Sequence, residues 1–278
     1  MMNKKLLNPL ILLITILSFS CNNSGKNNKP AKTMAAMNIH EESVTYSLNG
    51  KEYKALFAYD ENRKGIRPAI IVVPEWWGLN DYAKSRAKQL AELGYAAMAI
   101  DVYGGGKIAA DPKEAQELTT PFYKDPTLAK PIIDAAINKI KMMPHADPSN
   151  IAAIGYCFGG GLVLNAAKLG ANLKGVVSFH GSLKGVTPNK DLIKAKILVC
   201  HGAADQFENP NVAQFKKEMD SAHIDYIFKE YAGATHAFTN PDATEVGKKF
   251  NMPVEYNAAA DKASWNDMKD FFKNIFGK

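Results

Sequence analysis

The sequence contains very little arginine. Its only arginines are Arg63, Arg67 and Arg86, so the chain after position 86 has no guanidinium group. The formal net charge of +6 therefore comes from scattered lysines, without a basic run or interleaved aromatic residues. Proteins that bind nucleic acids concentrate their cationic side chains on one surface. The composition therefore predicts no nucleic-acid partner.

Metal-binding and phosphate-binding motifs are also missing. The chain has no HExxH sequence, no paired CxxC sequences and no cluster of histidines, so we expect neither a metal ion nor a cofactor. The glycines at 104–106 lack the GxxxxGK[ST] frame of a phosphate loop. Cys157 and Cys200 each lie at the end of a predicted strand. A disulfide between them is conceivable, but Cys200 is more simply a small buried apolar residue.

An apolar segment near the N-terminus is too short to cross a bilayer. It spans residues 10–19, whereas a membrane helix needs about 20 apolar residues. Lys4 and Lys5 precede it, which is the order of a secretory signal peptide. We therefore predict that residues 1–20 are a signal peptide and not a buried helix of the fold.

The residues around Cys21 resemble the lipobox of bacterial lipoproteins. Small Ser18 and Ser20 precede the cysteine, with Ser18 in the place of the usual leucine. The resemblance implies that Cys21 is lipidated, and Asn22 after it favours the outer membrane, facing the periplasm. Asparagine, lysine, glycine and serine are frequent in the segment that follows, so residues 21–40 are predicted to be a flexible tether behind the lipidated cysteine.

Strands and helices alternate through residues 41–278. Asn49-Gly50 predicts a hairpin between two early strands. The alternation after it is typical of one α/β domain with a mostly parallel sheet and helices on both faces. We expect strands at 44–48, 53–58, 69–73, 95–100, 151–154, 175–179, 197–200 and 226–231, and helices at 82–93, 127–143, 160–169, 212–222 and 256–275.

One turn carries the strongest chemical signal. Gly155-x-Cys157-x-Gly159 lies between a predicted strand and a predicted helix, which is the setting of a nucleophile elbow, with cysteine replacing serine. The glycines are needed because side chains there would collide with neighbouring backbone. The N-terminus of the helix favours a thiolate at Cys157, and a thiolate is a strong nucleophile. The alternative is an inert cysteine in a glycine-rich turn.

The partners of such a nucleophile follow it in the order acid, then base. Asp205 and His236 lie in this order beyond two later strands, and the carboxyl ends of parallel strands meet at one edge of a sheet. The acid can orient the imidazole to accept the thiol proton. Taken alone, Asp205 could be a loop-capping residue and His236 an ordinary loop histidine. The histidines at 40, 145, 180, 201 and 223 are interpreted as structural or surface residues; of these, only His180 and His201 could reach the pocket.

These residues, together with Val73-Pro74-Glu75-Trp76-Trp77-Gly78 and the segment 236–241, resemble the dienelactone hydrolase family over residues 41–278. The resemblance implies an α/β-hydrolase fold and cleavage of small esters or lactones. It also implies that an acidic residue after the third strand holds the resting thiol and takes its proton when substrate binds, and Glu75 matches that position. Without the resemblance, Glu75 would be interpreted as a salt-bridged loop carboxylate.

Two backbone N–H groups are expected to bind the oxyanion of the reaction. One belongs to Phe158, directly after the nucleophile, and the other to Trp76, in the loop after the third strand. Trp77, Tyr103 and Phe238 are candidate walls of the pocket, although aromatic residues in such loops are as often plain packing.

The scarcity of arginine bears on the substrate. The resemblance implies that dienelactone hydrolases hold a substrate carboxylate with arginines, but the matching stretches, 101–107 and 236–239, contain none. Lys107 offers one charge without the bidentate geometry of a guanidinium. We therefore predict hydrolysis of neutral esters or lactones through a thioester. Acyl transfer by the same residues and a non-catalytic, ligand-binding envelope lipoprotein are the alternatives.

Overall fold

The computed structural model describes residues 37–277. The predicted signal peptide, Cys21 and most of the predicted tether lie outside the described residues, and the first strand begins at Ile39. Within residues 37–277, no helix has both the length and the hydropathy needed to cross a bilayer.

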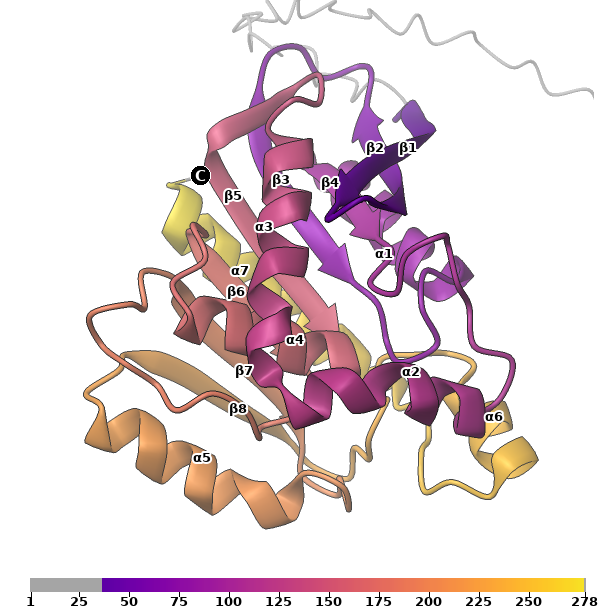
Figure 1. The fold of residues 1–278 in the computed structure, drawn as a ribbon, viewed down its shortest axis with the longest axis vertical. Helices are drawn as coiled ribbons and strands as arrows, with labels where there is room; N and C mark the ends of the chain where they lie inside the picture. The colour runs from indigo at the N-terminus through magenta and orange to yellow at the C-terminus, as the bar shows by residue number, and fades with distance from the viewer. Residues whose placement is uncertain (1–36, 278) are drawn as a thin grey trace, which may run out of the picture. The chain divides into compact units, whose positions relative to one another are not determined.

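Eight strands form one sheet in the order β1-β2-β4-β3-β5-β6-β7-β8 (Figure 1). β1 and β2 form an antiparallel hairpin, β2 pairs antiparallel with β4, and the strands from β4 to β8 are parallel. The hairpin turns at Asn49 and Gly50, which both have the positive φ that the predicted turn requires. The strands are β1 (Ile39–Leu48), β2 (Lys51–Asp60), β3 (Arg67–Val73), β4 (Ala96–Ile100), β5 (Ala146–Tyr156), β6 (Gly175–Phe179), β7 (Lys196–Gly202) and β8 (Tyr226–Tyr231).

Helices cover both faces of the sheet, which confirms the predicted fold class. α1 (Asp81–Glu92) and α7 (Ala258–Phe276) pack on one face, while α3 (Ala129–Ile140), α4 (Phe158–Lys168) and α5 (Asn209–Ser221) pack on the other (Figure 1). Successive residues of β3 show the alternation: Ile70 belongs to the core under α1 and α7, and Ile71 to the core under α3 and α4. Because both faces are buried there, β4 and residues 69–73 of β3 are apolar throughout, whereas the edge strand β8 is only partly buried and carries Lys229 and Glu230.

Two helices at the carboxyl end of the sheet were not predicted. α2 (Pro112–Lys124) contains Pro121 and buries only Ala115 and Thr119, and α6 (Ala243–Phe250) has only 8 residues and buries only Ala243 and Gly247. The predicted helix at 127–143 is also shorter: a 3-10 turn, η1 (Pro126–Leu128), precedes α3. Figure 1 shows α2 and α6 beyond the ends of the parallel strands, where the candidate site lies.

Candidate active site

Cys157 lies at the sharp junction between β5 and α4. Its backbone has φ 52° and ψ −118°, a combination that costs a non-glycine residue about 1–3 kcal/mol. The flanking glycines make this turn possible. A Cβ at Gly155 would lie 2.1 Å from the Gly159 carbonyl oxygen, and one at Gly159 would lie 2.4 Å from the Pro74 carbonyl oxygen. The spacing of the motif is therefore a steric requirement of the junction.

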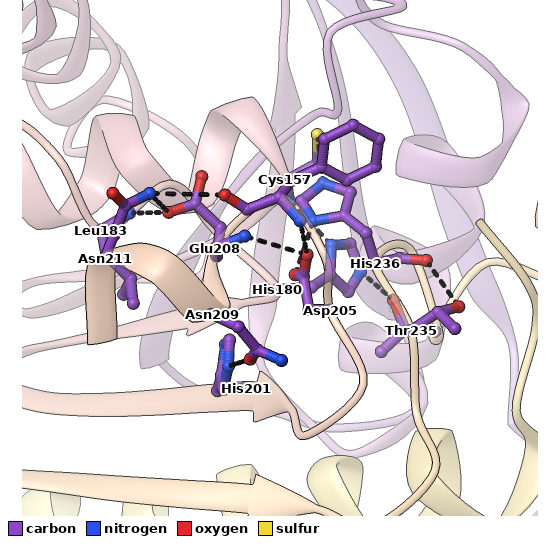
Figure 2. Close-up of polar contacts among 12 residues, drawn as sticks. Cys157, His180, Leu183, His201, Asp205, Glu208, Asn209, Asn211, Thr235 and His236 are labelled. Atoms are coloured by element: carbon purple, nitrogen blue, oxygen red, sulfur yellow. Dashed lines mark hydrogen bonds and ion pairs between the residues drawn. The ribbon is translucent and has the colours of Figure 1, made fainter. Parts of the chain in front are cut away.

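The structure brings Cys157, His236 and Asp205 together (Figure 2). His236 Nε2 lies 3.1 Å from Cys157 Sγ, and His236 Nδ1 lies 2.7 Å from Asp205 Oδ2. Asp205 follows β7, and His236 follows β8. The second carboxylate oxygen, Oδ1, accepts the backbone N–H groups of Phe207 and Glu208 at 2.9 and 3.1 Å. The carboxylate is thereby fixed in one orientation toward the imidazole.

Opposite charges set the protonation of this group. Burial works against a charged imidazole, but the sulfur of Cys157 and the carboxylate of Asp205 on either side raise the pKa of His236 well above its usual range. Burial likewise opposes ionisation of Asp205, but the hydrogen bond from His236 and the two backbone N–H groups lower the pKa of Asp205 overall. A cationic imidazole held by a buried carboxylate stabilises negative charge that develops on a neighbouring sulfur.

Glu75 lies in the loop after β3 and lines the same cavity as Cys157. Its side chain is 3% exposed, and Oε2 accepts a hydrogen bond from Asn240 Nδ2 at 2.7 Å. Burial raises the pKa of Glu75 to about 7, although Asn240 and His236 oppose the rise. Its partner is thus an amide and not the cation that a salt-bridged loop carboxylate would have, and the thiol of Cys157 contacts His236.

The two expected oxyanion donors flank the nucleophile. Phe158 is the first residue of α4, so its N–H belongs to the set at a helix N-terminus that has no partner within the helix. Trp76 follows Glu75 in the loop after β3 and lines the cavity. Tyr103 Oη donates to the Trp76 carbonyl oxygen at 2.7 Å and so holds the next peptide of the loop, between Trp76 and Trp77.

A cavity of about 670 Å³ opens at Cys157 and His236. Trp76 and Trp77 line it as predicted, and the unpredicted helix α2 contributes Phe122 and Tyr123. Among the described residues, the charged side chains on its wall are those of Glu75, Lys184 and Glu208.

Several residues lie elsewhere than predicted. Tyr103 and Phe238 are behind the cavity wall: the Tyr103 ring stacks on Phe158, and Phe238 is fully buried against His180. His180 and His201 are also buried and do not line the cavity. The sequence showed only that these rings lie next to predicted site residues along the chain. In the folded protein, the packing of the strands directs them into the core.

Lys107 and the arginines serve other contacts. Lys107 forms an ion pair with Glu114 and does not line the cavity. Arg63 pairs with Asp60, Arg86 pairs with Asp261, and Arg67 donates to backbone carbonyls. Sequence reasoning missed two charged residues on the wall, Lys184 between β6 and β7 and Glu208 between β7 and α5, because their loops gave no signal.

The remaining sequence signals are structural. Asp101 accepts hydrogen bonds from the backbone of Tyr103, Gly104 and Gly106, so the glycine run forms a turn held by that carboxylate. Within residues 37–277, no group of three or more histidine, cysteine or acidic side chains is arranged to hold a metal ion. Cys157 and Cys200 are both free.

A nucleophile elbow on a mostly parallel sheet, followed in the chain by an acid and a histidine, defines an α/β-hydrolase. The model of the dienelactone hydrolase family matches residues 54–276. The chain belongs to this family and is a hydrolase of the dienelactone hydrolase type.

Relatives match over most of their length. Protein usf from Aquifex pyrophilus is 27% identical over 84% of this chain and 97% of its own length. A protein from Aquifex aeolicus (strain VF5), whose name proposes a carboxymethylenebutenolidase, is 28% identical with the same coverage. Among solved structures, P91 from metagenomic libraries, a dienelactone hydrolase-like promiscuous phosphotriesterase, has a TM-score of 0.78 and 32% identity. The match covers 85% of this chain and 98% of P91.

Proposed function

We propose that this hydrolase cleaves neutral esters or lactones, with Cys157 as nucleophile, His236 as general base and acid, and Asp205 as the residue that orients His236. The continuous set of contacts carries the proposal: 3.1 Å from Sγ to Nε2 and 2.7 Å from Nδ1 to Oδ2. An imidazole held between a thiol and a buried carboxylate can accept the thiol proton and retain it until the leaving group departs.

Acylation forms a thioester. The thiolate of Cys157 attacks the carbonyl carbon, a C–S bond forms, and the π electrons of the carbonyl move onto its oxygen. The N–H groups of Phe158 and Trp76 bind this oxyanion, and such a donor contributes about 3 kcal/mol in related enzymes. As the oxyanion collapses, the C–O bond to the leaving group breaks and His236 donates its proton to the departing alkoxide.

Deacylation uses the same groups in reverse. His236 removes a proton from water, the hydroxide attacks the thioester carbon, and the C–S bond breaks to release the acid and restore the thiolate at Cys157. In a lactone, the alkoxide formed in the first step stays in the same molecule. Acyl transfer would place an alcohol or amine where the water is, and product analysis in the presence of added alcohol distinguishes it from hydrolysis.

Glu75 supports the nucleophile in this scheme. Its pKa of about 7 lets the buried carboxyl exchange a proton near neutral pH. It lines the cavity next to the loop peptide of Trp76. We propose that Glu75 takes up the thiol proton as substrate binds and passes it to His236, which then donates it to the leaving group; this is the thiol-activating role that the family resemblance implies.

The charges of the cavity favour neutral substrates. Its wall combines one lysine, Lys184, with two carboxyl groups, Glu75 and Glu208, so it offers no excess of positive charge to an anion. Glu208 already accepts hydrogen bonds from the backbone of Leu183 and from Asn211. A substrate carboxylate would gain no bidentate guanidinium contact here.

A comparison of two substrates tests the proposal. We expect kcat/KM for p-nitrophenyl acetate to exceed kcat/KM for dienelactone, and Cys157→Ala to abolish both. A strong preference for dienelactone would contradict the preference for neutral substrates, and a fully active Cys157→Ala protein would contradict the mechanism. Binding of esters without any turnover would instead support the non-catalytic alternative.

Neutral phosphotriesters are a second candidate substrate class. P91, which is 32% identical over 85% of this chain, is described as a promiscuous phosphotriesterase. A cavity of about 670 Å³ without excess positive charge can also accept a neutral triester. Release of p-nitrophenol from paraoxon by the wild-type protein, but not by Cys157→Ala, would support this activity.

We also propose that the protein is anchored to the bacterial outer membrane through lipid on Cys21, facing the periplasm. Ser18, Ser20 and Cys21 support this proposal. Cys21→Ala, or treatment with globomycin, should prevent formation of the mature lipid-anchored protein and shift it to an unprocessed form. A wild-type protein that fractionates as soluble and unlipidated would contradict it.

A further inference from the structure

His180 lies between the nucleophile and the loop of the base. It directly follows β6 and is fully buried, and it has a φ of 40°, which is uncommon for a residue other than glycine. Its own N–H donates to the Cys200 carbonyl oxygen of β7 at 2.8 Å. The backbone of His180 is therefore fixed to the neighbouring strand, and its ring reaches Cys157.

The ring of His180 contacts the backbone of the nucleophile. The Cys157 N–H is shared between the Phe179 carbonyl oxygen at 3.0 Å and His180 Nδ1 at 3.1 Å (Figure 2). Because a backbone N–H only donates, Nδ1 must accept, and the imidazole is neutral with its proton on Nε2. Burial, together with nearby His236 and Arg86, lowers the pKa of His180 well below its usual range, which agrees with this assignment.

The other nitrogen of the ring contacts the segment that carries the base. His180 Nε2 donates to Thr239 Oγ1 at 2.7 Å, and Thr239 follows His236 by three residues. Thr239 is itself fixed to α1: its hydroxyl lies 2.6 Å from Tyr82 Oη, and its carbonyl oxygen accepts Arg86 Nη2 at 2.6 Å. The ring of His180 also packs edge-to-face on the ring of His236, with centroids 5.4 Å apart.

We propose that His180 is a positioning residue of the reaction. Its neutral imidazole ties the strained backbone of Cys157 to the loop of His236, and so holds Sγ and Nε2 in contact before substrate arrives. This inference rests on the proposed roles of Cys157 and His236, and it adds a residue that does not line the cavity.

Variants at His180 separate positioning from packing. His180→Ala removes both contacts, and we expect kcat for p-nitrophenyl acetate to fall about 100-fold with KM changed less than about threefold, because small misplacements of reacting groups lower the rate that much. His180→Asn retains an acceptor for the Cys157 N–H and tolerates positive φ, so it should recover about tenfold of that loss. Thr239→Val removes the second contact together with that of the hydroxyl to Tyr82 Oη, and it should lower kcat by about fivefold. Tyr82→Phe, which keeps the Thr239 hydroxyl for His180, controls for the loss of the Tyr82 contact.

His201→Ala is the matched control, because His201 is an equally buried histidine whose Nε2 bonds Asn209, away from the cavity wall. It should leave kcat within about threefold.

Alkylation of Cys157 by iodoacetamide is a second readout. Measured without substrate on proteins with native near-UV circular dichroism, its rate should fall in His180→Ala and recover in His180→Asn. The positioning role is contradicted if kcat falls equally in the His201 and His180 variants, or if His180→Ala keeps wild-type kcat and alkylation. If His180→Ala does not fold, kcat and the alkylation rate of His180→Asn and Thr239→Val test the proposal by the same criteria. An active Cys157→Ala protein would refute the proposed function instead.

Discussion

Of the two described cysteines, Cys157 directly follows β5 and Cys200 lies within β7, and their surroundings differ in almost every respect. Cys157 has positive φ, is partly exposed, and has an imidazole 3.1 Å from its sulfur. Cys200 is fully buried in regular strand, and its sulfur contacts Tyr231 Oη at 3.5 Å. Burial raises the pKa of Cys200 to about 12, so it stays a thiol at neutral pH. The reactivity of a cysteine in this fold is thus a property of the turn and its neighbours.

The largest effect is expected when the sulfur of Cys157 is removed. Cys157→Ala should lower kcat/KM for p-nitrophenyl acetate by at least about 10³-fold, because no other group can form the thioester. Cys200→Ala should keep kcat within about twofold and lower the free energy of unfolding by about 1 kcal/mol, through the small void it leaves. Retention of more than a few per cent of activity in Cys157→Ala would contradict the assignment.

Replacing Asp205 tests the surroundings of Cys157 while leaving its thiol in place. Asp205→Asn should lower kcat by about 10³-fold, because the amide no longer holds His236 in the productive tautomer or stabilises its charge. Asp267→Asn is a suitable control, since Asp267 accepts a hydrogen bond from Tyr231 near Cys200 and does not line the cavity. A loss below tenfold in Asp205→Asn, or an equal loss in Asp267→Asn, would argue against the role of Asp205.

Burial also raises the pKa of Glu75, which lines the cavity together with Cys157. This shift makes the free energy of unfolding depend on pH in a defined direction. With a pKa of about 7 in the folded protein against 4.5 in the unfolded chain, Glu75 keeps a proton on folding that the unfolded state releases. The stability contributed by Glu75 is present below pH 4.5 and decreases as pH rises to about 7, by about 3 kcal/mol in total. The difference between wild type and Glu75→Gln in urea unfolding at pH 5, 6 and 7 measures it. A difference that does not change with pH would contradict the shift.

The smallest expected effect concerns Lys184, the lysine on the cavity wall. Lys184→Ala should lower kcat/KM for dienelactone by about threefold and leave p-nitrophenyl acetate unchanged, because an exposed lysine contributes about 1 kcal/mol or less to holding a carboxylate. Lys107→Ala, whose lysine pairs with Glu114, should change neither substrate. Equal losses for both lysines would indicate a general effect of surface charge.

Much of this arrangement could be predicted because it depends on short-range rules. The glycines around Cys157 reflect collisions with backbone atoms that any such turn would produce. The apolar strands and the order of Asp205 and His236 along the chain follow from burial and topology. The hairpin at Asn49 likewise needs only its own φ angles.

The features that escaped prediction depend on contacts between distant segments. α2 contains Pro121 and α6 has only 8 residues, so neither gives the long uninterrupted pattern from which a helix is predicted. The hydrogen bonds of His180 join β6 to the elbow and to Thr239, 59 residues away, and no spacing in the sequence indicates them. Tyr103 was expected on the wall, but its hydroxyl supports the peptide between Trp76 and Trp77 from behind.

Arg86 links the loop of the base to the two helices, α1 and α7, that cover one face of the sheet. Its guanidinium donates to the Thr239 carbonyl oxygen and to Asp261 of α7, both at 2.6 Å, and it is 5% exposed. The segment after His236 is therefore bonded to α1 directly and to α7 through the Arg86–Asp261 ion pair, and it cannot detach without breaking the buried hydrogen bond from Arg86. Loops of this kind usually exchange their amide hydrogens through local opening. Here the amides of residues 237–240 should exchange through near-global unfolding, so that the loop of the base and the core melt as one cooperative unit.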